Sequence, residues 1–320
     1  MARTRDIIEE IAEIRQRRRF GVATAELLIR LFALEHAFAK HDKADEELTR
    51  YFPVAIIACV EAYLRMAIQD LIDAGEPFLS NAERAAATLK LDFEVLRAVH
   101  GKAITVGELI AHSVSLSRLD HIDSTLSGLL GTGFLAGLRI TTNRWANEVM
   151  GRPSAPILAD PDAVFADVAR TFELRHIICH EIASAYPIKS DEVERCFKSC
   201  LSFLRAADEF ISEALQPGAP LTQTDMNIVA GDSLERARER LDAALAKLHS
   251  RLDAEESAAL DKSQSCWQAY CDAWARFAAG RATGGTIWPL IYAKTAEDAV
   301  QRRIEEVEKF RRLGEDDNGL

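Results

Sequence analysis

A short stretch of the chain combines one arginine with two histidines. Residues 173–181 read ELRHIICHE and contain Arg175, His176 and His180. Histidine has an ordinary pKa of ~6.5, so it can take or give a proton at neutral pH. Arginine stays charged and presents a planar fork of donors that fits phosphate oxygens. These residue types therefore fit acid–base chemistry at a phosphate group.

The spacing of these residues is not specific by itself. An arginine followed five or six positions later by a histidine occurs at three places: Arg175/His180, Arg30/His36 and Arg170/His176. The first of these lies in a strongly apolar segment, which holds Phe165, Val168, Phe172, Ile177 and Ile178. Charged groups leave water only when they are paired or functional, so we expect a buried polar cluster here and regard it as a site candidate.

A second polar pair interrupts the apolar segment YFPVAIIACVEAYLRMAIQDLID at residues 51–73. Glu61 and Arg65 are four residues apart and share one face of the helix that this segment predicts. Pro53 fits the first turn of that helix, and Gly75 and Pro77 end it. Because its first half is almost entirely apolar, we expect this helix at the centre of a core.

Two simpler interpretations of the same residues remain open. Arg175 pairs with Glu61 or Glu173 to join two core helices, and His176 and His180 are ordinary core histidines. Alternatively, Glu173, His176 and His180 place three metal ligands on one helical face. The sequence contains no H-E-x-x-H motif and no second ligand cluster to complete a metal shell. We therefore expect no metal and no cofactor.

Composition and charge limit the class of protein. The chain has 320 residues, enough for about two domains, and a net charge of −11. An acidic protein does not bind nucleic acid through its average field, so a phosphate site must be a local basic pocket. We find no apolar run of the ~18 residues that a membrane span needs, and no secretory signal. We expect a cytoplasmic protein with six reduced cysteines and no membrane contact.

Few glycines and prolines and repeated helical spacing predict an all-α fold. The segment QPGAPL at residues 216–221 is the clearest domain boundary. We divide the chain into a charged N-terminal arm, two helical domains and a disordered tail, at residues 1–24, 25–215, 222–313 and 314–320. The arm is either solvated or in contact with phosphate. The helices are predicted at 5–19, 24–40, 51–73, 79–100, 163–184, 190–215, 233–250, 254–280 and 289–310.

The two polar pairs resemble the HEPN superfamily, a group of helical bundles with many metal-independent ribonucleases. In that family an early core helix carries an acidic and a basic residue four apart, as at Glu61 and Arg65. A later helix carries Arg, a polar residue and His, as at Arg175, His176 and His180. The resemblance covers about residues 25–212, in which the poorly patterned residues 101–160 form an insertion.

The HEPN resemblance implies a role for each of these residues. Arg175 holds the scissile phosphate of RNA, His180 is the acid or base, and His176 assists. Glu61 and Arg65 orient them, with Glu173 nearby. The products are a 2′,3′-cyclic phosphate and a 5′-hydroxyl. Arg175 and His180 project about 140° apart on one helix, so the family's pairing of two such helices across a cleft implies a homodimer.

The C-terminal domain resembles the LprI-type lysozyme-inhibitor domain over about residues 222–312. The matching positions are Thr224, Asp225, Met226, Asn227, Leu241, Leu245, Trp267, Tyr270, Asp272, Gly284, Gly285, Thr286 and Pro289. Members of that family are usually exported and disulfide-bonded. Here Ala275 and Thr295 stand at the expected cysteine positions, which agrees with a reducing compartment. Trp267, Trp274 and Trp288 either pack a three-helix core or form an aromatic surface for a partner.

The sequence therefore predicts a metal-independent endoribonuclease in a toxin–antitoxin or phage-defence system. Its expected partners are RNA, a second copy of the chain, and an antitoxin or regulatory protein. The alternatives are a catalytically inactive HEPN-fold scaffold and a protein-inhibitor module that acts through the C-terminal domain.

Overall fold

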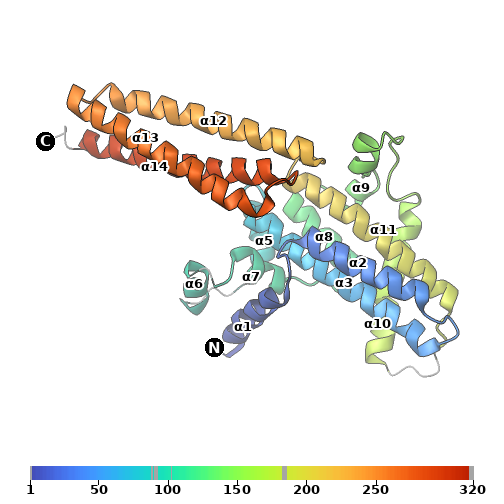
Figure 1. The fold of residues 1–320 in the computed structure, drawn as a ribbon. Helices are drawn as coiled ribbons and strands as arrows, with labels where there is room; N and C mark the ends of the chain where they lie inside the picture. Colours follow the sequence, from blue (N-terminus) through green and yellow to red (C-terminus); the bar gives the residue numbers. More distant parts are fainter. Residues whose placement is uncertain (1, 88, 90–92, 102, 182–185, 317–320) are drawn as a thin grey trace. The chain divides into compact units, whose positions relative to one another are not determined.

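The computed structural model of the chain is helical (Figure 1) and describes residues 2–87, 89, 93–101, 103–181 and 186–316. The predicted all-α class is confirmed, since the regular elements of the described residues are helices. Extended pairing among them is limited to one isolated bridge between Thr142 and Pro156. The chain divides into two compact units, Met1–Gly218 and Ala219–Leu320. The division lies inside the predicted boundary segment 216–221.

The first unit is built around the long helix α3 (Glu46–Asp73). Its most extensive contacts are with four helices: α2 (Ala23–Lys40), α7 (Val106–Ser113), α10 (Pro161–His180) and α11 (Ser190–Leu215). Figure 1 shows α2, α10 and α11 beside it. Because α3 is enclosed in this way, most of its side chains are buried, as the apolar sequence predicts.

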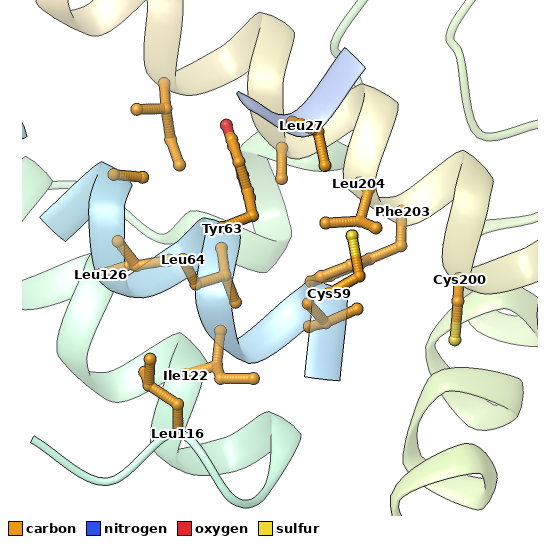
Figure 2. Close-up of a cluster of buried hydrophobic side chains, with 14 of the residues drawn as sticks. Leu27, Cys59, Tyr63, Leu64, Leu116, Ile122, Leu126, Cys200, Phe203 and Leu204 are labelled. Carbon is orange, nitrogen blue, oxygen red and sulfur yellow. The ribbon is translucent and has the colours of Figure 1, made fainter. Parts of the chain in front are cut away.

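Side chains of α3 form the middle of the main core. Figure 2 shows Cys59, Tyr63 and Leu64 of α3 among side chains from several neighbouring helices. These neighbours include Leu27, Leu116, Ile122, Leu126, Phe203 and Leu204. Leu64 is fully buried, and so are Ile122 and Leu126 of α8 (Leu119–Leu130). The core thus joins residues that are far apart in the sequence.

Helix α3 begins five residues earlier than predicted. The carboxylate of Asp45 accepts a hydrogen bond from the backbone N–H of Leu48 at 2.9 Å and caps the helix. Pro53 therefore lies inside the helix rather than in its first turn. The longer helix contains an 18-residue window with a mean hydropathy of 1.5, which meets the length and composition test for a membrane span. Since 67% of that window is buried in the structure, its hydropathy is that of a core helix.

The N-terminal segment is not a solvated arm. Residues 2–17 form α1 (Ala2–Arg17), which packs against α6 (Phe93–His100) and α7. Ile11 is 2% exposed and contacts a small cluster with Val95 and Leu109. Arg15 donates to the carboxylate of Glu108 at 2.9 Å, and Glu108 is 3% exposed. The apolar side of this short helix and one ion pair hold it on the unit.

The prediction of one continuous helix over residues 79–100 is wrong. This region instead contains two single turns, α4 (Phe78–Asn81) and α5 (Glu83–Ala86), and then α6. Ser80, a residue type that favours N-caps, lies inside α4, and its hydroxyl donates to Glu76 at 2.8 Å. The region between residues 101 and 160, which has no clear pattern, holds α7, α8, α9 (Phe134–Leu138) and one π-helical turn (Trp145–Val149).

The second unit consists of three long helices with a core of small and aliphatic side chains. They are α12 (Gln223–His249), α13 (Ala254–Ala279) and α14 (Trp288–Asp316), with a 3-10 turn at Gly280–Ala282. Helix α12 begins ten residues earlier than predicted because Thr222 accepts a hydrogen bond from the N–H of Asp225 at 3.1 Å. Residues 314–316 of the predicted disordered tail continue α14, and the rest of that tail lies outside the described residues.

We predict that Gly107→Ala destabilises the protein by about 2 kcal/mol, because the added methyl group overpacks the contact between α7 and α3. A Cβ at Gly107 would lie 2.6 Å from the carbonyl oxygen of Gln69 and 2.6 Å from Oδ1 of Asp73. Gly128 is the matched control, since a Cβ there meets nothing within 4 Å. Urea denaturation should show Gly128→Ala neutral or stabilising by ~0.5 kcal/mol. Equal effects of the two substitutions would contradict the close α3–α7 contact.

A second prediction concerns pH. Asp208 of α11 accepts hydrogen bonds from Thr24 Oγ1 at 2.9 Å and Tyr63 Oη at 3.1 Å, and burial raises its pKa. The folded state therefore holds the Asp208 proton more tightly than the unfolded state does. The contribution of Asp208 to the free energy of unfolding is therefore fully present below its ordinary pKa of 3.8. It is lost as the pH rises through the raised pKa of the folded state.

Asp208→Asn removes this ionisation but keeps an acceptor for Thr24 and Tyr63. We expect the difference in unfolding free energy between the variant and the wild type to shift in favour of the variant as pH rises above about 4. The shift should level off at neutral pH. Chemical denaturation at a series of pH values measures it, and a constant difference across the series would show that Asp208 keeps its ordinary pKa.

Candidate functional site

Helix α10 carries the predicted catalytic residues in its last two turns. Its start is fixed by Asp160, whose carboxylate accepts from the N–H of Ala163 at 3.1 Å, with Pro161 next to it. The buried side of α10 ends at Leu174, which is fully buried. Beyond Leu174 the helix extends past the core, so its polar residues lie near solvent.

The prediction of a buried polar cluster is therefore wrong for the histidines. The side chain of His176 is 65% exposed, and His180 is also exposed. Their rings lie 5.2 Å apart, centroid to centroid, with planes at 46°. His176 Nε2 lies 4.0 Å from a carboxylate oxygen of Glu181. Both imidazoles are therefore accessible to solvent and to a bound ligand.

Arg175 forms an ion pair with Glu61, as one of the simpler interpretations expected. The guanidinium Nη2 lies 3.8 Å from Oε2 of Glu61 on α3, and the two side chains are 33% and 25% exposed. This distance is too long for a hydrogen bond. Within the described part of the chain, the guanidinium makes no hydrogen bond, so its donors are free for another acceptor. Glu61 thus holds the Arg175 side chain in place by an ion pair and takes none of its N–H donors in a hydrogen bond.

Arg175 and His176 line an open pocket of about 1080 Å³ between α8 and α10. Phe172, Leu119 and Leu135 provide apolar wall, and charged residues of both signs surround it: Arg118, Asp120, Asp123, Glu173 and Glu181. Arg118 is paired with Asp120 at 3.0 Å. The pocket is large enough for a nucleotide-sized ligand, but its charge is mixed.

Of the other predicted residues, Glu173 also lines this pocket, whereas Arg65 and His180 do not. Arg65 donates a hydrogen bond to the backbone carbonyl of Ala111 on α7 and does not line the Arg175 pocket. Burial lowers the pKa of Arg65, and the nearby charge of Glu61 partly offsets this. Glu173 is 65% exposed and pairs with Arg170 at 2.9 Å. His180 is not among the pocket-lining residues. One chain thus brings together Glu61, Arg175 and His176, but not Arg65 or His180.

The described residues hold no group of three or more His, Cys, Asp and Glu side chains arranged to bind a metal ion. Arg118 and Asp120 at the rim of the pocket were missed by the sequence analysis. They belong to the poorly patterned region 101–160. The only sequence signal near them is the helical spacing of apolar residues that begins at Leu119, the first residue of α8.

In the second unit, three aromatic side chains of α13 are exposed. Tyr270, Trp274 and Phe277 are 60%, 42% and 74% exposed, and the rings of Trp274 and Phe277 stack at 5.7 Å. Trp267, in contrast, packs against the core. Each of the two expectations for the tryptophans therefore holds for one residue. Trp267 packs in the core, and Trp274 lies on the surface.

Several positions that carry the LprI resemblance tie the three helices together. Asn227 of α12 donates to the carbonyl of Thr286 at 2.9 Å. Tyr292 of α14 donates to the carboxylate of Asp272 on α13 at 2.7 Å, and this bond lowers the pKa of Asp272 together with Arg276. Ala275, at an expected cysteine position, is fully buried in the core. All six cysteines are free thiols.

Residues 216–307 match the family model described as "Lysozyme inhibitor LprI". This confirms the resemblance of the C-terminal domain. The match covers less than half of the chain and does not extend to residues 25–212, for which HEPN similarity stays a prediction. Searches of curated proteins and of solved structures find no significant match to the chain.

Proposed function

We propose that the first unit is a metal-independent endoribonuclease of the HEPN type. One observation carries this proposal. Arg175 lies in the wall of an open pocket beside the exposed imidazole of His176, and the ring of His180 lies 5.2 Å from that of His176. An ion pair to Glu61 holds Arg175, whose donors make no hydrogen bond within the described residues. A guanidinium with free donors fits a phosphodiester, and imidazoles fit the proton transfers that its cleavage needs.

In the proposed reaction a histidine takes the proton of a ribose 2′-hydroxyl. The 2′-oxygen then attacks the phosphorus atom, and the bond from phosphorus to the 5′-oxygen breaks. A second imidazole gives a proton to the leaving 5′-oxygen. Arg175 binds the non-bridging oxygens, whose negative charge grows in the transition state. The products are a 2′,3′-cyclic phosphate and a 5′-hydroxyl.

A homodimer supplies the groups that one chain does not bring together. His180 projects away from Arg175 and does not line the same pocket. If two α10 helices pair, the partner subunit's His180 can reach a phosphate held by Arg175, while His176 assists from the same chain. This dimer acts on RNA in the cytoplasm, in a toxin–antitoxin or phage-defence setting that includes an antitoxin or regulatory protein.

A second candidate function belongs to the second unit. The family match to a lysozyme inhibitor and the exposed rings of Tyr270, Trp274 and Phe277 support a protein-inhibitor module. Exposed aromatic side chains are enriched at the energetic centres of protein interfaces. In this candidate α13 presents its aromatic side to a lysozyme.

We predict that the purified chain cleaves single-stranded RNA in the presence of EDTA and leaves 2′,3′-cyclic phosphate ends. Arg175→Ala and His180→Ala should each lower the rate by roughly 100-fold or more, because each removes a group that acts in the transition state. Stability should change by less than ~1 kcal/mol, since the Arg175–Glu61 pair is partly solvated. Gel analysis of labelled RNA, with circular dichroism of each variant, measures both effects.

Arg205→Ala and His36→Ala are matched controls, because both residues are exposed and lie outside the pocket. They should cleave RNA like the wild type. Expression of the wild type should arrest growth, and Arg175→Ala should relieve the arrest. Equal cleavage by the wild type and the Arg175→Ala/His180→Ala double variant would rule out the assigned roles. Loss of cleavage in EDTA would support metal chemistry instead.

For the second candidate, we predict that the full chain inhibits lysis of bacterial cell walls by a purified c-type lysozyme. Trp274→Ala and Phe277→Ala should each weaken inhibition about tenfold, the loss expected for an aromatic interface anchor. Phe310→Ala is the control, because Phe310 is a similarly exposed ring (61%) on α14. Absence of inhibition at high protein concentration, or equal inhibition by all three variants, would exclude this candidate for lysozyme.

A further inference from the structure

A second pocket of the first unit, of about 670 Å³, lies among α1, α2, α3 and the end of α7. It is distinct from the Arg175 pocket and shares no lining residue with it. Its apolar wall comes mainly from α2 and α3, at Leu27, Ala58, Cys59, Ala62 and Met66. Four arginines and one histidine from four different segments meet in the same pocket: Arg17, Arg18, Arg30, Arg65 and His112.

Three of these side chains, Arg18, Arg65 and His112, are partly buried. Arg18 donates to the neutral amide oxygen of Gln69 at 2.9 Å, and Arg65 donates to the backbone carbonyl of Ala111. In the described residues, no carboxylate lies within ion-pair distance of any of the three. Each arginine therefore keeps further N–H donors for a ligand.

The carboxylates near Arg18 are bonded to other groups. Glu108 accepts from Arg15, and Asp70 accepts from the backbone N–H of Ala23 at 3.1 Å. Glu26 accepts from the N–H of Phe20 at 2.6 Å, which lowers the pKa of Glu26. Glu10 is the remaining acidic lining residue, and its side chain is exposed.

Burial acts against positive charge in this pocket. It lowers the pKa of Arg18 and of Arg65, and nearby carboxylates offset this only in part: Glu108, Asp70 and Glu26 at Arg18, and Glu61 and Glu10 at Arg65. Burial also lowers the pKa of His112, and the charges of Arg65 and Arg18 lower it further, while Glu10 and Glu108 oppose this effect. Partly buried cations that no carboxylate contacts directly cost free energy, and a bound anion would lower that cost.

We propose that this pocket binds a small amphiphilic anion, with one phosphate, sulfonate or carboxylate group on an apolar or aromatic body. The guanidinium groups of Arg18 and Arg65 hold the anionic group, since a planar fork of donors matches its oxygens. The apolar body lies along α3 at Ala58, Ala62 and Met66. The volume of about 670 Å³ is in the range of small-molecule sites.

The test uses two fluorescent probes of nearly the same shape. 8-Anilinonaphthalene-1-sulfonate carries the anionic group, and N-phenyl-1-naphthylamine has the same aromatic body without it. We expect the sulfonate to bind the full-length folded chain with one saturable site and to exceed the neutral probe in affinity. Competition by phenyl phosphate, benzenesulfonate and benzoate then ranks the anionic groups.

Arg18→Gln and Arg65→Gln should each weaken sulfonate binding by roughly tenfold, the loss expected for one charged hydrogen bond. Ala62→Trp should block the pocket without changing any charge, because Ala62 lines it from an exposed position on α3. Arg19→Gln is the control, since Arg19 is a neighbouring exposed arginine outside the lining. Circular dichroism checks that each variant is folded.

Two results would overturn the proposal. One is sulfonate binding that is equal in the wild type, Arg18→Gln and Ala62→Trp. The other is equal affinity for the neutral and the anionic probe, which would show an apolar surface and no anion site. Neither Arg18 nor Ala62 belongs to the proposed nuclease site, so these results do not depend on RNA cleavage.

Discussion

The organisation of the first unit depends on how α3 satisfies its few polar side chains. The helix is mostly buried, and a buried polar group without a partner costs more free energy than most single contacts contribute. The polar side chains of its C-terminal half are met by several neighbouring segments. Asp73 accepts from Thr105 Oγ1 at 2.6 Å and from the N–H of Gly107 at 2.9 Å, and Asp70 accepts from the first residue of α2. Glu61 and Arg65 are met by α10 and α7.

This constraint explains why α3 contributes to two pockets. Glu61 pairs with Arg175 at the side of α10, and Arg65 lies four residues later, where α7 and the N-terminal segment meet. Glu61 and Arg65, which form one acid–base pair in the sequence pattern, therefore serve different pockets in the structure. Its acidic member holds an arginine in the candidate nuclease pocket, and its basic member belongs to the pocket of Arg18 and His112.

The sequence predicted the parts of this unit that depend on local periodicity. Helices α2, α10 and α11 lie close to their predicted ranges. The start of α3 was missed because the capping carboxylate of Asp45 outweighs the preference of Pro53 for a first turn. The exposure of His176 and His180 could not be predicted, because the length of α10 beyond the core depends on where the core ends. The second pocket gathers residues from four segments, and no local pattern indicates such a pocket.

The net charge of −11 gives the two pockets different electrostatic roles. The average field of the chain repels anions, so anion binding must come from cations that are close to the ligand and not neutralised. In the α10 pocket, Glu61, Glu173 and Glu181 offset Arg175 and His176, so a ligand there competes with carboxylates. In the α1–α3 pocket, four arginines line the wall against two carboxylates, Glu10 and Glu26. The α10 pocket therefore has the exposed groups that catalysis needs. The α1–α3 pocket has the excess positive charge that binding of a small anion needs.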